Sequence, residues 1–275
     1  MEQISPEQIV AMAPLSMSEL DRRIMAGIGE PSRRDLRLFH LIKNTDYFRL
    51  LLRTGALSLC RCDKFEDDEA DGLLPEPNRN AESETMRRLY ADLERHATID
   101  GKKLKMERDP QQEYDSQVIA RLTAYVHCWF SGPAPSAEMW AKYGQHGSGI
   151  CIQTTARALT AAIPRQHPFG QVLLGSIAYS DCTQPIGTFL SYLPFFHKHD
   201  RYAFENEVRI VALVSPDPRT GEYRVEQERM PLKLDIRSAI HRVVIGSRVP
   251  LETEQQLRGD LAGFVGPIPV VKNQE

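Results

Sequence analysis

Short apolar segments of strand length recur through the chain after residue 35, separated by turn residues and polar stretches. Their ranges are 36–42, 56–60, 124–130, 149–154, 171–179, 205–214 and 241–246. Between the first two, residues 46–53 have a helical pattern, and Gly55 fits the left-handed position that closes a helix. A strand, a helix and a strand joined by close connections indicate an α+β or α/β core. We therefore expect one α+β domain over residues 36–275, with a mixed or antiparallel β core and short helices at 136–143 and 251–261.

Two other regions are predicted to be helical. Residues 1–35 begin with a capping serine, Ser5, followed by a proline at the first helical position, and end near Gly29 and Pro31. We expect this region to form a helical arm that packs against the core or contacts a protein partner. Residues 80–122 are polar and charged but carry two amphipathic patterns, which predict a helical insertion over one side of the core.

The composition excludes several classes of protein. Hydrophobic residues make up 41% of the chain and charged residues 26%, a balance typical of a globular protein. The net charge of −3 and the pI of about 6.3 argue against a broad electrostatic surface for nucleic acid or an anionic membrane. There is no apolar run of about 18 residues that would span a membrane. The five cysteines lack the paired spacings of a zinc site, and no signal-peptide pattern opens the chain, so we expect a cytoplasmic protein.

Two glutamates, Glu205 and Glu207, are separated by one residue just before the apolar segment 208–214. On a strand their side chains would share a face and point together into a cleft. Paired carboxylates can divide roles, because their repulsion separates their pKa values. The alternative is an exposed edge at which the two acids form surface ion pairs with Arg201 or Arg209.

The chain resembles a bacterial domain family of uncharacterised function over roughly residues 36–246. Three sequence blocks carry the resemblance: a G-x-L strand followed by an F-x-D turn, an M-W-x-x-Y block that runs into GICI, and a K-x-x-x-Y-x-x-E-x-E-x-R block. Their residues are Gly55, Leu57, Phe65 and Asp67; then Met139, Trp140, Tyr143, Gly147 and residues 149–152; then Lys198, Tyr202, Glu205, Glu207 and Arg209. This resemblance implies a shared fold but no settled reaction.

More distantly, the chain resembles ADP-ribosyltransferase domains. The likeness rests on His40 in an early strand, the helix and G-x-L strand after it, and the E-x-E that precedes the apolar segment 208–214. The serine-threonine-serine strand of arginine-directed transferases is missing, because the nearest match is CWFSG. The resemblance implies a split sheet, NAD as a substrate, and transfer of ADP-ribose to a protein or nucleic-acid acceptor by a toxin or a phage-defence effector.

The resemblance also assigns roles to individual residues. Breaking the nicotinamide–ribose bond builds positive charge on the sugar, which a carboxylate stabilises in the transition state. Glu207 would supply that carboxylate, Glu205 would orient or deprotonate the acceptor, and Tyr143 would be the third catalytic residue. The expected cofactor-binding residues are Trp140, which would share nicotinamide stacking with Tyr143, His40 for the adenosine ribose or a phosphate, Lys198 or Arg209 for the pyrophosphate, and the hydroxyl of Ser131. No metal is expected in this mechanism.

Other interpretations of these residues stay open at this point. His40, Trp140 and Tyr143 also fit ordinary core packing, which is the more common role of such residues in these patterns. One alternative function is a non-catalytic interaction or sensor domain that uses the N-terminal helices as its contact surface. Another is a metal-dependent phosphodiesterase or nuclease, in which Glu205, Glu207 and Asp67 would bind a divalent ion.

Overall fold

A computed structural model describes residues 36–65, 98–99, 102–103, 119–181, 192–217, 219–220, 223, 225, 227–264 and 268–273. The expected N-terminal arm, Asp67 and nearly all of the expected insertion at 80–122 lie outside these residues. Residues 119–123 are described and form a helical turn that leads into a strand. Among the described helices, none combines the length and the apolar character needed to cross a bilayer.

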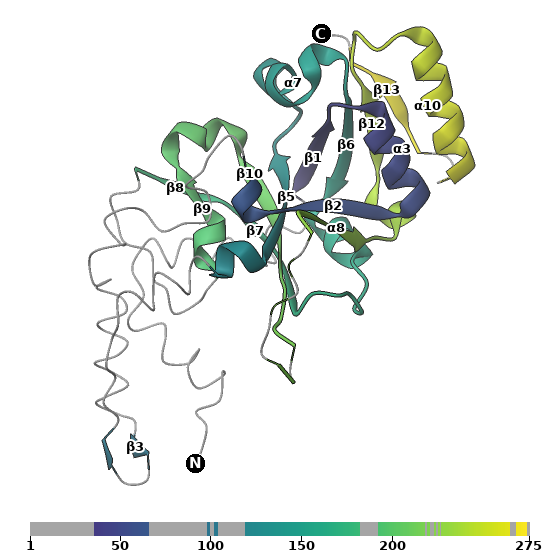
Figure 1. Cartoon of the computed structure of the whole chain (residues 1–275). Coiled ribbons are helices and arrows are strands. Elements are labelled where there is room, and N and C mark those ends of the chain that lie inside the picture. The colour runs from purple at the N-terminus through teal and green to yellow at the C-terminus, as the bar shows by residue number, and fades with distance from the viewer. Residues whose placement is uncertain are drawn as a thin grey trace.

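The described chain is organised around a mixed, mostly antiparallel sheet of nine strands, which confirms the expected α+β class (Figure 1). The strands are β1 (Arg37–Ile42), β2 (Ala56–Arg61), β5 (Ala124–Ser131), β6 (Ile150–Thr155), β7 (Gln171–Ser176), β10 (Glu207–Leu213), β11 (Arg229–Lys233), β12 (Arg242–Ile245) and β13 (Val270–Lys272). They follow the order β11-β2-β5-β1-β6-β12-β13, and β10 pairs with β5 and with β7. The β12–β13 pair is parallel and the other pairs of this sheet are antiparallel.

The sheet divides along one edge of β5. On this edge β2 pairs with Tyr125 and Val126, whereas β1 pairs with Phe130 and Ser131. The other edge of β5 pairs with β10 along its whole length, from Ala124 to Phe130. On the β1 and β2 edge, residues 127–129 therefore face an opening between these two strands in the described structure, and this opening positions the candidate site.

Two further strand pairs are short. β3 (Thr98–Ile99) pairs with β4 (Lys102–Lys103), and β8 (Ala178–Ser180) pairs in parallel with β9 (His197–His199). The strand expected over residues 171–179 is thus broken after Ser176, because β7 and β8 have different partners.

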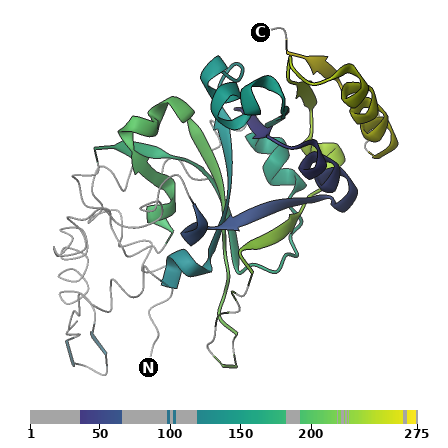
Figure 2. The same ribbon diagram turned by 45° about the horizontal axis from the view of Figure 1, so that its top comes forward.

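Helices cover one face of the sheet. They are α3 (Thr45–Thr54), α8 (Ala156–Ala162), α9 (Ile236–Ala239) and α10 (Leu251–Phe264). The side chain of Asn44 caps the first turn of α3, and Gly55 closes the helix at φ 62°, as expected from the sequence. α3 and α10 lie side by side (Figure 2), and Arg49 Nε donates to Asp260 Oδ2 at 2.7 Å between them.

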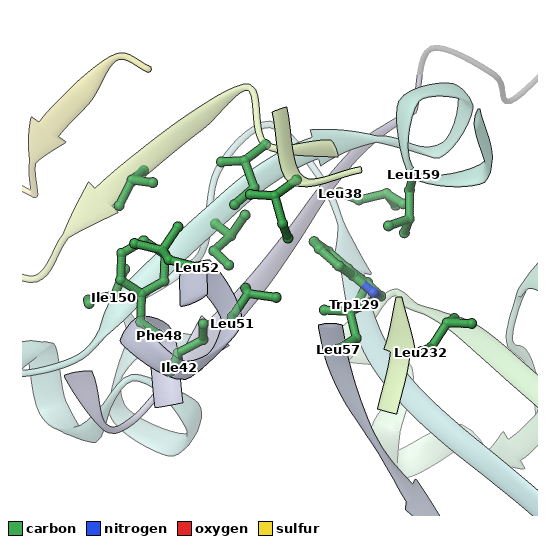
Figure 3. Packing of buried hydrophobic residues seen from close by; sticks show 14 of the residues in the cluster. Leu38, Ile42, Phe48, Leu51, Leu52, Leu57, Trp129, Ile150, Leu159 and Leu232 are labelled. Carbon is green, nitrogen blue, oxygen red and sulfur yellow. The ribbon is translucent and has the colours of Figure 1, made fainter. Parts of the chain in front are cut away.

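The main core packs between these helices and the sheet (Figure 3). Phe48, Leu51 and Leu52 of α3 meet Trp129 of β5 and Ile150 of β6 in this cluster. Burial of this apolar surface supplies the main driving force for the fold.

The opposite face carries two smaller clusters. One packs the 3₁₀ helix η5 (Leu193–Phe196) on β5 and β10. The other packs α7 (Ala137–Tyr143) on β1, β5 and β6. The candidate site lies between these two clusters.

Candidate functional site

A cavity of about 190 Å³ lies between α7 and the residues that lead into β10. Its described lining comes from residues between 40 and 209, including the strands β1 and β5, the helix α7 and the start of β10. The lining residues are His40, Leu41, Phe65, Cys128, Trp129, Phe130, Met139, Lys142, Tyr143, Lys198, Tyr202, Glu205, Glu207 and Arg209. The six residues His40, Tyr143, Lys198, Glu205, Glu207 and Arg209, which the sequence marked as site residues, therefore lie together around one pocket.

Glu207 is the first residue of β10, and its side chain is 4% exposed. Arg209 Nε donates to Glu207 Oε1 at 2.5 Å, and Lys198 Nζ donates to Oε2 at 3.1 Å. Burial by itself would raise the pKa of Glu207, but the two cations outweigh it and lower the pKa to about 2. Glu207 is therefore a buried carboxylate that stays ionised at neutral pH.

Glu205 is also 4% exposed and points into the same cavity. Tyr143 Oη donates to Glu205 Oε1 at 2.5 Å, and Lys142 Nζ donates to the same oxygen at 3.0 Å. Lys198 Nζ donates to Glu205 Oε2 at 2.9 Å, so its ammonium group bridges the two carboxylates. Opposite charges at these distances hold the two glutamates together in spite of their mutual repulsion.

The backbone arrangement that brings the two glutamates together differs from the one expected. Glu205 ends the 3₁₀ helix η6 (Asp200–Glu205), and Asn206 adopts a left-handed conformation at φ 42° before β10 begins. The expectation that both residues share one face of a strand is thus wrong. The turn is held in place because Ser131 donates to Asn206 O from its backbone N–H at 2.9 Å and its hydroxyl at 3.1 Å.

Arg209 is fully buried, and both ends of its guanidinium are engaged by the protein. Besides its contact with Glu207, Nη1 donates to the carbonyl of Phe195 at 3.0 Å. A buried, bidentate arginine fixes the orientation of the carboxylate. This geometry suits a positioning residue for Glu207 and does not suit the contact with pyrophosphate that the sequence suggested.

His40 lies in the opening of the sheet. Its Nδ1 is 3.0 Å from the carbonyl oxygen of Cys128, which only accepts hydrogen bonds, so Nδ1 carries the proton and donates. Desolvation lowers the pKa of His40 to about 4. The imidazole is therefore neutral at physiological pH with a lone pair on Nε2, which can accept a hydrogen bond from a hydroxyl group but brings no positive charge to a phosphate.

The rings of His127 and Trp129 lie beside the His40 ring at this opening. The His40 and His127 ring centroids are 4.2 Å apart, and the His40 and Trp129 centroids are 5.3 Å apart. His127 Nδ1 and Trp129 Nε1 are buried, and in the described structure neither has a hydrogen-bond partner. Burial and the neighbouring His40 lower the pKa of His127 well below its ordinary value, so this ring too is neutral.

Two of the expected cofactor-binding residues are not among those that line the cavity. Trp140 is 5% exposed and packs in the α7 cluster with Phe39 and Phe130, as core packing would require. The hydroxyl of Ser131 donates a hydrogen bond to the carbonyl oxygen of Asn206. Neither geometry supports stacking on nicotinamide or a direct contact with a cofactor.

Two further residues line the cavity that were not predicted as site residues, Lys142 and Tyr202. Of these, Tyr202 belongs to the K-x-x-x-Y-x-x-E-x-E-x-R block, whereas Lys142 was not singled out in the sequence. Lys142 Nζ lies 4.9 Å, 5.5 Å and 5.2 Å from the ring centroids of Tyr143, Tyr202 and Phe204. Lys198 Nζ lies 4.6 Å from the Tyr202 ring. Lys142 directly precedes Tyr143 in the sequence, and this position could have indicated it, because both residues donate from α7 to Glu205 Oε1.

The metal interpretation finds little support at these carboxylates. In the part of the chain that the structure describes, no group of three or more histidine, cysteine or acidic side chains is arranged to hold a metal ion. Lys142, Lys198 and Arg209 already neutralise the two glutamates, and a divalent ion would have to displace them. Asp67, the third expected ligand, lies outside the described residues.

Comparison of the chain with protein-family models, with curated proteins and with solved structures found no match. Both resemblances noted in the sequence therefore rest on the motifs alone.

Proposed function

We propose that the protein is an ADP-ribosyltransferase-like enzyme that cleaves NAD and transfers ADP-ribose to a macromolecular acceptor. The observation that carries the proposal is the convergence of Glu205, Glu207, Tyr143 and His40 on one cavity where the sheet divides. The acceptor would be a protein or a nucleic acid. A cytoplasmic toxin or phage-defence effector is the biological role that suits such a transfer.

In the proposed reaction the nicotinamide–ribose bond breaks and its electron pair leaves with neutral nicotinamide. Positive charge then develops on the ribose, next to the carboxylate of Glu207, which is ionised because its pKa is about 2. An anion that is already oriented stabilises this charge without reorganisation in the transition state. Arg209 and Lys198 provide the orientation.

Glu205 would act on the acceptor. The acceptor nucleophile attacks the ribose carbon that nicotinamide left, and its proton passes to the carboxylate of Glu205. The short contacts with Tyr143 and Lys198 hold that carboxylate on the cavity wall. Glu205 therefore serves as the proposed general base and Glu207 as the electrostatic group.

The size of the cavity fits part of a dinucleotide. Binding sites for drug-sized ligands have volumes of about 300–1,000 Å³. A cavity of about 190 Å³ suits one ring and one sugar. Nicotinamide and its ribose would enter it, and the rest of NAD would extend beyond the described walls.

The test compares wild type with Glu207→Gln for thermal stability in millimolar NAD and for release of nicotinamide. We expect NAD to raise the unfolding temperature of wild type, since a ligand of the folded state stabilises it by mass action. Nicotinamide release should fall by at least about 100-fold in the variant, in line with the loss of an oriented charged group.

Glu254→Gln is the matched control, because Glu254 is also buried and ion-paired, with Arg258 and Lys272, but does not line the cavity. This variant should keep both NAD binding and nicotinamide release. Absence of an NAD effect on folded wild type would contradict the proposal.

A second candidate is a non-catalytic binding domain. It is favoured by the saturation of both carboxylates with cations, a pattern also found in structural ion-pair networks. A stable NAD complex without nicotinamide release in the presence of cell extract as a source of acceptors would favour this candidate.

A further inference from the structure

Three cations line the cavity beside the two carboxylates and differ in how they contact them. Lys198 bridges Glu205 and Glu207, the buried Arg209 is held against Glu207, and Lys142 contacts Glu205. A partly desolvated cation is stabilised by an anionic partner, so a ligand that brings an anionic group would be favoured beside Lys142.

Lys142 is the member of this cluster best placed to meet such a group. Its side chain is 34% exposed, compared with 11% for Lys198 and 0% for Arg209. Lys142 donates one described hydrogen bond, to Glu205 Oε1, and it shares that oxygen with Tyr143. An ammonium group has three donors, so Lys142 can bind a further acceptor at the cavity mouth.

The aromatic rings around Lys142 lower the free-energy cost of exchanging Glu205 for a ligand group as its partner. Tyr143, Tyr202 and Phe204 surround the ammonium at 4.9–5.5 Å. These contacts are directed at ring faces and tolerate a small displacement of the charge. The lysine stem is flexible, so the charge can turn from Glu205 toward the mouth and keep part of its aromatic contact.

We infer that Lys142 binds the phosphate group of the ligand and, on doing so, gives up its ion pair with Glu205. The inference rests on the proposed function, because it assigns the phosphate-bearing part of NAD to the mouth of the same cavity. Glu205 then keeps Tyr143 and Lys198 but loses one cation, which leaves its Oε1 open to a hydrogen bond from the acceptor. Binding of the anionic substrate would thereby prepare the group that activates the acceptor.

Calorimetric titration with three probes tests the inference: inorganic pyrophosphate, nicotinamide mononucleotide and nicotinamide riboside. The two nicotinamide compounds differ only in the phosphate. Wild type is compared with Lys142→Gln and Lys142→Arg, and with Lys272→Gln as a control. Lys272 is similarly exposed at 39% and ion-paired with Glu254, outside the cavity lining.

We expect Lys142→Gln to weaken binding of the mononucleotide and of pyrophosphate about tenfold, or about 1.4 kcal/mol. Binding of the riboside should change less than twofold, and Lys142→Arg should restore most of the affinity for the phosphate compounds. Raising the salt concentration should weaken phosphate binding in wild type more than in Lys142→Gln, because the attraction is screened. Lys272→Gln should bind all three probes as wild type does.

The outcomes separate this inference from the proposed function. Equal weakening of mononucleotide and riboside binding, or unchanged phosphate binding in Lys142→Gln, would overturn the role of Lys142 even if NAD is cleaved. Pyrophosphate binding that depends on Lys142 in a protein that does not bind NAD would support the anion site and refute the NAD proposal. The absence of any phosphate binding to wild type would overturn the inference.

Discussion

Arg209 and Glu207 lie two residues apart on β10, and the buried guanidinium of Arg209 holds the Glu207 carboxylate at 2.5 Å. The sequence left open whether this pair was a surface contact. With exposed fractions of 0% and 4%, it is instead an ion pair inside the domain. Removing one partner of such a pair leaves an uncompensated buried charge, which costs more than the pair itself contributes.

Arg209→Gln should therefore lower the free energy of unfolding by about 3–5 kcal/mol, measured by denaturant unfolding at neutral pH. Arg258→Gln is the control, since Arg258 is 43% exposed in its ion pair with Glu254 and should lose less than about 1 kcal/mol. Equal losses in the two variants would contradict the burial of the Arg209 charge.

The lowered pKa of Glu207 predicts a loss of stability in acid. Its pKa is about 2 in the folded protein and 4.5 ordinarily, so below pH 4.5 the unfolded chain takes up a proton before the folded protein does. The stabilisation is complete above about pH 4.5 and is lost as the pH falls toward 2, and it amounts to about 3 kcal/mol.

Glu207→Gln should unfold more easily at neutral pH but show a smaller further loss of stability between pH 5 and pH 2. Chemical unfolding at several pH values gives the difference. The same acid dependence in the variant and in wild type would show that Glu207 is not the titrating group.

His40 predicts a second acid effect in a higher pH range. Its pKa falls from 6.5 to about 4 on folding, so the unfolded chain binds more protons than the folded protein between these values. The free energy of unfolding should therefore decrease as the pH falls from about 6.5 to 4, by about 1.4 kcal/mol per pH unit at most from His40 alone. His40→Gln, which keeps a side-chain donor for Cys128 O, should reduce this slope, and NMR titration of the His40 ring should give a midpoint below pH 5. A midpoint near 6.5 would refute the buried, neutral imidazole.

The contact between Tyr143 and Glu205 predicts a measurable role for one hydroxyl. Tyr143→Phe removes a charge-assisted hydrogen bond to a buried carboxylate, which is worth about 1.5–3 kcal/mol. Thermal and denaturant unfolding should show a loss in this range. Tyr47→Phe should show none, because Tyr47 is 67% exposed on α3. If Tyr143→Phe left the stability unchanged, Lys142 and Lys198 would satisfy the Glu205 carboxylate without the hydroxyl.

Two glycines predict opposite effects of the same substitution. Gly55 closes α3 at φ 62°, where a Cβ is disfavoured, so Gly55→Ala should destabilise the protein by about 1 kcal/mol. Gly259 lies inside α10 with open space where a Cβ would stand, so Gly259→Ala should stabilise the protein by about 0.5–1 kcal/mol. Thermal unfolding of the two variants measures both shifts, and shifts of equal sign would contradict the left-handed closure at Gly55.

The local elements could be predicted because their signals lie within a few residues. The apolar segments became strands, and Ser136 caps α7 through a bond from the backbone N–H of Met139. The position of Glu205 at the end of η6 instead of on β10 was not predictable. It depends on the left-handed conformation of Asn206 and on Ser131 of the neighbouring strand β5, whose hydroxyl donates to the carbonyl of Asn206.

The α+β class and the approximate bounds of most strands could be read from the amino-acid sequence, since these follow from apolar patterning and short spacings. Tertiary packing sets which strands meet β5, and hence where the sheet opens around His40. It also decided that Lys142 reaches Glu205 across 63 positions and that Trp140 turns into the core. Such contacts depend on the packing of whole elements against one another, which local patterning does not specify.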